Sequence, residues 1–306
     1  QVQEYANYRS SDIGGNFDVV IVDADQLYDQ FAYGVDRHSI AMRNFAFWTQ
    51  ETYTNPEFMF IIGKGLEYVY NRTEAQMAEN GIGLVPTWGN PGSDNVIVTS
   101  DDSTKPIYPV GRIAVETADE IQIYLDKIKA HDQNSLNPLT IEDRLWQKKV
   151  LHLSGGTTDI QENLFNNLAV MADTIENNMF GADVITFRKV STDAISEATS
   201  DQIFEQINTG VSLLTFFGHA SVGSFDFNLD NVERYENSGK YPLILSLGCY
   251  SGNIFTTNDE SISEDFVKAS NKGAIAFLAA SGTAYIGVQN KFGKEFYSRL
   301  GGADYG

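Results

Sequence analysis

The chain has 306 residues, of which 21 are Lys or Arg and 41 are Asp or Glu, so its formal net charge is −20. Because phosphate binding requires a concentrated Lys/Arg surface, this composition argues against nucleic acid as a partner. The single Cys excludes an internal disulfide and a multi-thiolate metal site; no apolar run is long enough to span a membrane, and the chain opens with neither a leader nor Met, as expected of an excised piece.

Apolar runs of strand length alternate along the chain with segments of helical period, which predicts an α/β layered fold with mostly parallel sheets. The expected strands cover residues 17–22, 58–62, 107–112, 149–153, 183–187, 211–217, 243–247 and 274–279. The expected helices cover residues 39–49, 117–131, 160–178, 201–207, 261–268 and 288–300. Most of the strands lack polar alternation, which is typical of strands covered by helices on both faces.

A polar stretch with an Asn-Pro step, HDQNSLNPLTI over residues 131–141, separates a finished helix from a new strand. Asn and Pro in such a stretch favour a linker. We therefore expect two side-by-side subdomains, an N-terminal one over residues 1–136 and a C-terminal catalytic one over residues 145–306.

Two predicted strands lead directly into short polar sequences that begin with glycine. Residues 211–217 are followed by Gly-His-Ala-Ser and residues 243–247 by Gly-Cys-Tyr-Ser, which place His219 and Cys249 just beyond the strands. Connections long enough for a crossover helix precede both strands, so we expect them to be parallel, with their carboxyl ends at one edge of the sheet. A free thiol is mostly protonated at neutral pH, and an adjacent imidazole that accepts its proton makes it a nucleophile. The backbone N–H groups of Ala220 and Cys249 are candidates to hold an oxyanion.

Each of these residues also has an ordinary structural interpretation. A lone Cys at a strand end is commonly a small packed side chain, and a lone His is commonly a satisfied group at the rim of the core. The occurrence of both at the ends of successive strands, each beside a glycine, favours the catalytic interpretation.

The two sequences resemble motifs of the gingipain-like cysteine peptidases, family C25 of the caspase-like clan. FFGHASVGSFDF is similar to the family's His-bearing strand end and LSLGCYSGNIF to its Cys-bearing one, in the same order, while residues 93–128 resemble the segment that closes its first subdomain. The resemblance covers most of the chain. It implies a caspase/gingipain-like α/β/α sandwich and a cysteine-type endopeptidase that acts on polypeptides, with Cys249 as nucleophile and His219 as general base.

The same resemblance suggests residues for substrate binding. Asp159 matches an acidic residue that binds a basic P1 side chain in the arginine-specific members, and Tyr285 lies where an aromatic ring would wall that pocket. Asp159 also opens a predicted helix, where Asp is an ordinary residue. Family members can carry a Glu on the strand after the linker to orient the His; Ser154 stands in that region here, so either the dyad works unaided or another acid serves.

No cofactor is required by this reading. Asp94, Asp101 and Asp102 lie in oxygen-rich stretches that are candidates for a structural calcium site. Aspartates in such stretches are also common turn residues.

The first hundred residues resemble one branch of the family more closely, the PorU-type sortases of the type IX secretion system of Bacteroidetes. Residues 23–48 and the Ile-Gly-Lys-Gly of residues 62–65 carry this likeness. It implies an exported protein, extracellular or associated with the cell surface or outer membrane, that works with other type IX components. Such a protein cleaves a sorting signal from secreted cargo and passes the acyl group to a lipopolysaccharide amine.

The alternative is a catalytically inactive gingipain-like scaffold or binding module in secretion. Ala220 stands where the family usually has Gly, and the orienting Glu is missing, which favours this alternative. The retention of both His219 and Cys249 argues against it.

Overall fold

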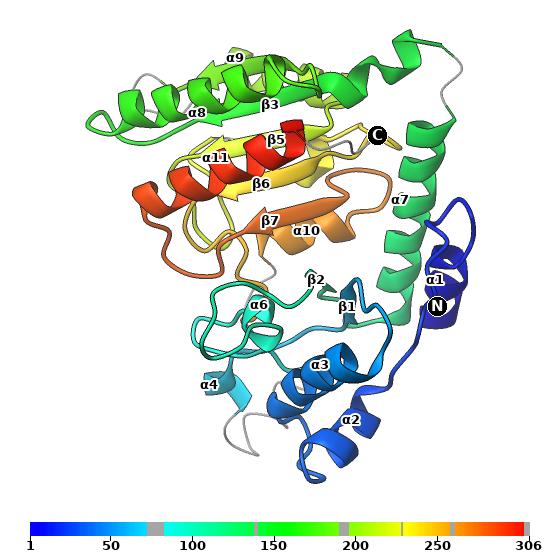
Figure 1. Ribbon diagram of the computed structural model, residues 1–306. Helices are drawn as coiled ribbons and strands as arrows, with labels where there is room; N and C mark the ends of the chain where they lie inside the picture. Colours follow the sequence, from blue (N-terminus) through cyan, green and yellow to red (C-terminus); the bar gives the residue numbers. More distant parts are fainter. Residues whose placement is uncertain (72–82, 138–139, 190–195, 228, 258–260, 303–306) are drawn as a thin grey trace. The chain divides into compact units, whose positions relative to one another are not determined.

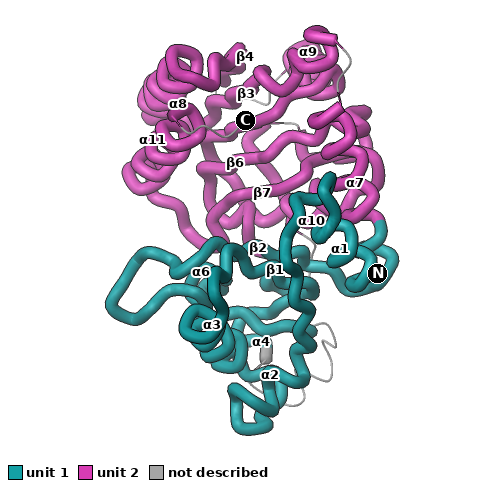
Figure 2. Tube along the Cα trace, turned by 45° about the vertical axis from the view of Figure 1, so that its right-hand side comes forward, with its two compact units in different colours: residues 1–122, 254–259 teal, residues 123–253, 260–306 magenta. Residues whose placement is uncertain are grey.

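The computed structural model describes residues 1–71, 83–137, 140–189, 196–227, 229–257 and 261–302 (Figure 1). The chain divides into two compact units, unit 1 with residues 1–122 and 254–259 and unit 2 with residues 123–253 and 260–306 (Figure 2). Among the described residues, no helix combines the length and the apolar character needed to cross a membrane.

The structure contains the strands expected from residue 58 onward and all six expected helices, with shifted ends. Unit 1 holds α1 (Val2–Arg9), α2 (Ala24–Phe31), α3 (Ile40–Thr52), β1 (Met59–Ile62), α4 (Tyr68–Asn71), α6 (Asp94–Ile97), β2 (Val110–Ile113) and the start of α7 (Ala118–Leu136). Unit 2 holds the rest of α7, η1 (Glu142–Lys148), β3 (Lys149–Ser154), α8 (Gln161–Glu176), β4 (Asp183–Arg188), α9 (Glu197–Thr209), β5 (Leu213–Phe217), η2 (Val232–Arg234), β6 (Leu243–Leu247), α10 (Ile262–Lys268), β7 (Ala276–Ala279) and α11 (Ile286–Gly302).

The strand expected over residues 17–22 is wrong, because this segment has no regular secondary structure. Val20 and Ile21 are 57% and 45% exposed, and only the end of the segment, Val22, packs against the core of unit 1. The next element along the chain is instead α2, where Asp23 accepts a hydrogen bond from the N–H of Asp25 as an N-cap.

The boundary between the units falls inside α7, earlier than the division expected between residues 136 and 145. The helix continues through the first part of the predicted linker and ends at Leu136. Its middle turns belong to unit 2 because their side chains are buried there: Lys127 is 2% exposed and its Nζ donates to the carbonyl oxygens of Phe266 (3.0 Å) and Val267 (2.9 Å).

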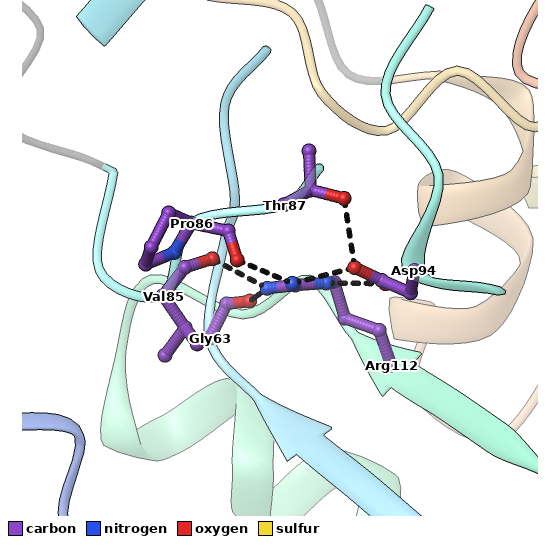
Figure 3. Close-up of polar contacts among 6 residues, drawn as sticks. All are labelled: Gly63, Val85, Pro86, Thr87, Asp94 and Arg112. Carbon is purple, nitrogen blue, oxygen red and sulfur yellow. Dashed lines mark hydrogen bonds and ion pairs between the residues drawn. The ribbon is translucent and has the colours of Figure 1, made fainter. Parts of the chain in front are cut away.

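In unit 1, β1 and β2 form a parallel pair, and a buried arginine ties the segments around them together. The Arg112 guanidinium makes two bonds of 2.7 and 2.8 Å with the Asp94 carboxylate and also donates to the carbonyl oxygens of Gly63 (2.7 Å) and Val85 (2.9 Å) (Figure 3). Thr87 Oγ1 donates to the same carboxylate at 2.9 Å. The Arg112 side chain is only 1% exposed, so this network is a structural element of unit 1.

The three aspartates considered for calcium thus have protein partners. Asp94 pairs with Arg112, Asp101 pairs with Arg43 at 2.7 Å, and Asp102 accepts from the hydroxyl of Ser100 at 2.7 Å. Within the described residues, no group of three or more His, Cys, Asp or Glu side chains is arranged to hold a metal ion. Structural calcium stays a prediction.

Unit 2 is a five-stranded parallel sheet with strand order β4-β3-β5-β6-β7 and helices on both faces. Alternate residues of β3 point to opposite faces: Leu151 packs with residues of α9 and α10, whereas Val150 packs with residues of α8 and α11. Figure 1 shows α8 and α11 together over one face. This arrangement confirms the predicted α/β/α layers.

Candidate active site

The candidate site residues all follow carboxyl ends of neighbouring parallel strands in unit 2. In the register of the sheet Ser154 pairs with Phe217, Phe217 with Leu247, and the preceding residue Ser246 with Ala279, so β3, β5, β6 and β7 end at one edge. The loops that leave this edge carry, in the order of the strands, Asp159, His219, Cys249 and Tyr285.

His219 and Cys249 occupy equivalent positions on adjacent strands. Phe217 and Leu247 are paired in the sheet register. His219 lies two residues after Phe217, and Cys249 lies two residues after Leu247. The two loops are in contact, because a Cβ atom built on Gly248 would lie 2.7 Å from the Cβ of Ala220. The His219 side chain is exposed and Cys249 is partly buried. The sheet register therefore places the two residues in neighbouring loops at the same edge.

The sulfur of Cys249 is held by the loop that follows β7. The backbone N–H of Ala284 donates to Sγ at 3.3 Å, and Sγ lies 3.6 Å from the carbonyl oxygen of the same residue. Ala284 stands two residues before α11, a 17-residue helix. In the first turn of this helix the N–H of Val288 donates to the Tyr285 carbonyl. An N–H donor and a helix amino terminus both favour negative charge on the sulfur.

Tyr250, the residue after Cys249, has a left-handed backbone conformation with φ of 57°. A non-glycine residue in this region is strained and persists only where its surroundings hold it. Here its N–H donates to the carbonyl of Gly282 at 2.9 Å, and its hydroxyl lies 3.0 Å from Thr283 Oγ1. These contacts fix the sharp turn that presents Cys249.

The backbone N–H groups predicted to bind an oxyanion are available. Neither Ala220 nor Cys249 donates its N–H to another residue within the described part of the chain. Ala220 forms an isolated antiparallel bridge with Phe225, so the chain reverses direction shortly after His219. The assignment of these two amides to an oxyanion hole stays a prediction.

Asp159 and Tyr285 lie in loops on either side of the dyad. Asp159 is exposed and accepts the hydroxyl of Thr157 at 2.5 Å, which lowers the pKa of the carboxyl below its ordinary value; the nearby charge of His219 acts in the same direction. Tyr285 is 70% exposed and directly follows Ala284, the residue that contacts the sulfur. Both side chains are exposed at the edge of the sheet that also carries His219 and Cys249.

Ser154 does not orient His219. It is fully buried and its Oγ has no hydrogen-bond partner in the described residues. The sequence reasoning missed a different residue near His219, Asp226, whose N–H donates to the His219 carbonyl at 3.0 Å. The signal that could have found it is the acidic residue in SFDF, shortly after the His motif.

A family model for peptidase family C25 matches residues 1–305. Similar solved structures include the crystal structure of the Arg-specific cysteine proteinase gingipain R (RgpB), with TM-score 0.67, 17% identity, and 85% of this chain and 57% of that chain covered. The complex of Porphyromonas gingivalis RgpB pro- and mature domains has TM-score 0.74 and 14% identity, with 99% and 66% covered. A third, described as a structure of a protease, has TM-score 0.63 and 16% identity, with 84% and 52% covered.

These likenesses confirm the predicted caspase/gingipain-like fold. The chain spans between 52% and 66% of the length of the three chains it matches. No curated protein matches it.

Proposed function

Because the chain belongs to peptidase family C25, we propose that it is a cysteine peptidase in which Cys249 is the nucleophile and His219 the general base. The observation that carries the proposal is the equivalent placement of these residues beyond the paired ends of β5 and β6. The N–H of Ala284 on the sulfur supports it, since this donor favours the thiolate.

The proposed chemistry uses groups at the sheet edge only. Cys249 Sγ attacks the carbonyl carbon of the scissile peptide while its proton passes to His219, and the N–H groups of Ala220 and Cys249 hold the oxyanion. Collapse of this intermediate breaks the C–N bond, and His219 gives the proton to the leaving amine. A second nucleophile, water or an amine, then loses a proton to His219 and attacks the thioester, and the proton returns to the released sulfur.

We propose that the substrate is a polypeptide with Arg or Lys at P1. Asp159 supports this because it is exposed at the same edge, and its lowered pKa keeps it ionised at mildly acidic pH. An ionised carboxylate binds a guanidinium or ammonium through charge-assisted hydrogen bonds. Tyr285, exposed on the opposite flank of the dyad, would pack against the aliphatic part of such a side chain.

We also propose that the protein acts outside the cytoplasm as a sortase-like member of the type IX secretion system, on the sorting signals of secreted cargo. The likeness of residues 23–48 to that branch supports this finer assignment. In the chemistry above, a sortase differs from a hydrolase only in the second nucleophile, which is an amine.

Alkylation of the native protein by iodoacetamide tests the dyad, and the single Cys makes the labelled site unambiguous. We expect native Cys249 to react faster than the urea-unfolded chain at pH 7, and His219→Ala to slow the native reaction at least tenfold. A native reaction no faster than the unfolded one and unchanged by His219→Ala would instead indicate the inactive scaffold.

Product analysis tests the finer assignment separately. A peptide with a basic P1 residue is incubated with the protein, with and without glucosamine as acceptor amine. The masses of the products are then measured by mass spectrometry. We expect an amide product when the amine is present. Release of the free acid alone, at all amine concentrations, would remove the sortase proposal and leave the peptidase proposal standing.

A further inference from the structure

Asp226 lies beside His219 because the chain folds back after β5. The N–H of Asp226 donates to the His219 carbonyl at 3.0 Å, and the bridge between Ala220 and Phe225 pairs the two strands of this turn. Lys189, the residue that follows β4, donates from Nζ to the Asp226 carbonyl at 3.2 Å. Both the backbone position and the direction of the turn are therefore fixed.

The carboxylate of Asp226 is oriented by the loop that follows β3. Its Oδ2 accepts the N–H of Gly156 at 2.6 Å, while Oδ1 is buried and has no hydrogen-bond partner in the described residues. Gly155 provides the space, because a Cβ atom there would lie 2.2 Å from Oδ1. Gly155 in turn lies against Gly218, the residue before His219.

A buried carboxylate oxygen without a partner is unfavourable and requires an explanation. In this structure the ring of His219 is exposed and hydrogen-bonds to no described residue. Across the backbone pairing of this turn, Asp226 thus holds a carboxylate oxygen without a described donor, and His219 an imidazole without a described hydrogen bond. The other carboxylate that interacts with the charge of His219 is Asp159, in the loop after β3.

We propose that Asp226 is the positioning residue of the dyad, and that its Oδ1 accepts the ring N–H of His219 that faces away from Cys249. The bond forms when the imidazole closes on the sulfur in the substrate complex, since catalytic hydrogen bonds are often long or unmade before substrate binds. The inference rests on the proposed function and supplies the acid that Ser154 does not.

The expected consequence is a more stable thiolate–imidazolium pair. A carboxylate on the far nitrogen holds the ring in one tautomer and orientation and favours its protonated form. The proton of Cys249 then moves to His219 at lower pH than it would without Asp226. The acid side of the pH–rate profile for alkylation reports this directly.

Asp226→Asn is a sharp test because the backbone fixes which way the amide points. The N–H of Gly156 requires an oxygen at the Oδ2 position, so the amide nitrogen occupies the Oδ1 position. A donor then faces the ring N–H of His219, and the bond is lost with little change of shape. Asp230→Asn is the matched control, because Asp230 braces the same loop by accepting the N–H of Phe225 at 2.7 Å, a bond that an amide oxygen also makes. Burial raises the pKa of Asp230 to about 6, so this control also removes the other carboxyl of the loop that titrates within the measured range.

The experiment measures iodoacetamide alkylation of Cys249 between pH 5 and 9 in the wild type, Asp226→Asn, Asp230→Asn, His219→Ala and the double variant Asp226→Asn/His219→Ala. We expect Asp226→Asn to slow the reaction about tenfold at pH 6 and to move the acid limb to higher pH, as one pKa unit implies. Asp230→Asn should leave the limb in place. In the His219→Ala background, Asp226→Asn should have no effect, since it acts through the ring.

Two results would overturn the inference. One is an acid limb that Asp226→Asn leaves unmoved while His219→Ala still slows the reaction. The other is an Asp226→Asn effect of equal size with and without His219, which would indicate a structural role. If the wild-type reaction did not depend on His219, the proposed function itself would fail. That outcome is measured by comparing the wild type with His219→Ala, whereas the inference is measured by comparing the wild type with Asp226→Asn.

Discussion

Gly155 and Asp226 fit together so closely that a side chain at position 155 would force the Asp226 carboxylate to move. A Cβ atom on Gly155 would lie 2.2 Å from Asp226 Oδ1 and 2.8 Å from its Cγ, well inside the distance of van der Waals contact. The glycine follows β3, and the aspartate follows β5. The loop after β3 therefore helps to set the position of the Asp226 carboxylate, which lies in the loop after β5.

Gly155→Ala should therefore displace the Asp226 carboxylate and break its bond with the N–H of Gly156. We expect a loss of about 1 to 3 kcal/mol in the free energy of unfolding, as for overpacking elsewhere, and a shift of the alkylation profile in the direction of Asp226→Asn. Urea denaturation and the pH–rate profile measure the two effects. Gly223→Ala is the control, because a Cβ there meets nothing within 4 Å; equal effects of the two substitutions would contradict the prediction.

Asp159→Asn should abolish a preference for basic P1 residues without removing the activity. The neutral amide loses the charge-assisted contact, so kcat/KM for Arg and Lys substrates falls by at least tenfold while that for a neutral P1 changes little. The lowered pKa of Asp159 gives a pH prediction too, because the carboxylate stays charged below its ordinary pKa. The basic preference should thus persist at pH 5. A peptide-library digest that shows no basic preference in the wild type would remove this role and leave the dyad untouched.

His152 should make the protein sensitive to acid. It is fully buried in β3, and its Nε2 lies 2.7 Å from the hydroxyl of Tyr297, which lies 2.6 Å from Thr215 Oγ1. Burial lowers the pKa of His152 from 6.5 to about 3. As pH falls below 6.5, the unfolded chain binds a proton that the native protein does not, so stability present above pH 6.5 is lost on the way down to pH 3.

The loss from this one group approaches about 4 to 5 kcal/mol at the acid end of the range, at roughly 1.4 kcal/mol per pKa unit. His152→Leu removes the group and should flatten the dependence of unfolding free energy on pH between 6.5 and 4, relative to the wild type. Urea denaturation at several pH values checks this. Parallel pH curves for the two proteins would show that His152 does not remain neutral in the native state.

Asp94→Ala should destabilise unit 1 strongly. It leaves the Arg112 guanidinium, 1% exposed, without its counter-charge, and loss of one partner of a buried ion pair typically costs about 3 to 5 kcal/mol. Asp101→Ala is the matched control, because that carboxylate is fully exposed in its pair with Arg43 and should contribute nothing measurable. Thermal melting of both variants distinguishes the buried pair from the exposed one; equal melting temperatures would refute the assignment.

Local sequence predicted the strands of unit 2 and their polar ends well. Uninterrupted apolar runs such as those of β5 and β6 indicate strands covered on both faces, and the glycines after them mark the sharp exits. The same pattern wrongly predicted a strand over residues 17–22, where Phe17, Val20 and Ile21 are exposed. Whether an apolar run becomes a strand depends on a neighbouring strand and a covering layer, which distant parts of the chain supply.

By itself, the sequence determined the layered α/β architecture and identified His219 and Cys249 as the candidate pair, since strand periodicity, glycine turns and residue chemistry are all encoded within a few neighbouring residues. Only the tertiary structure placed Asp226 across from His219 in the turn after β5. Ser154, in the region where the family can carry the orienting Glu, is buried without a described partner, whereas Asp226 lies in the turn after β5 and accepts the N–H of Gly156. The physical reason is steric: the Asp226 carboxylate fits against Gly155 because glycine has no Cβ, and this contact joins two loops that are distant in the sequence.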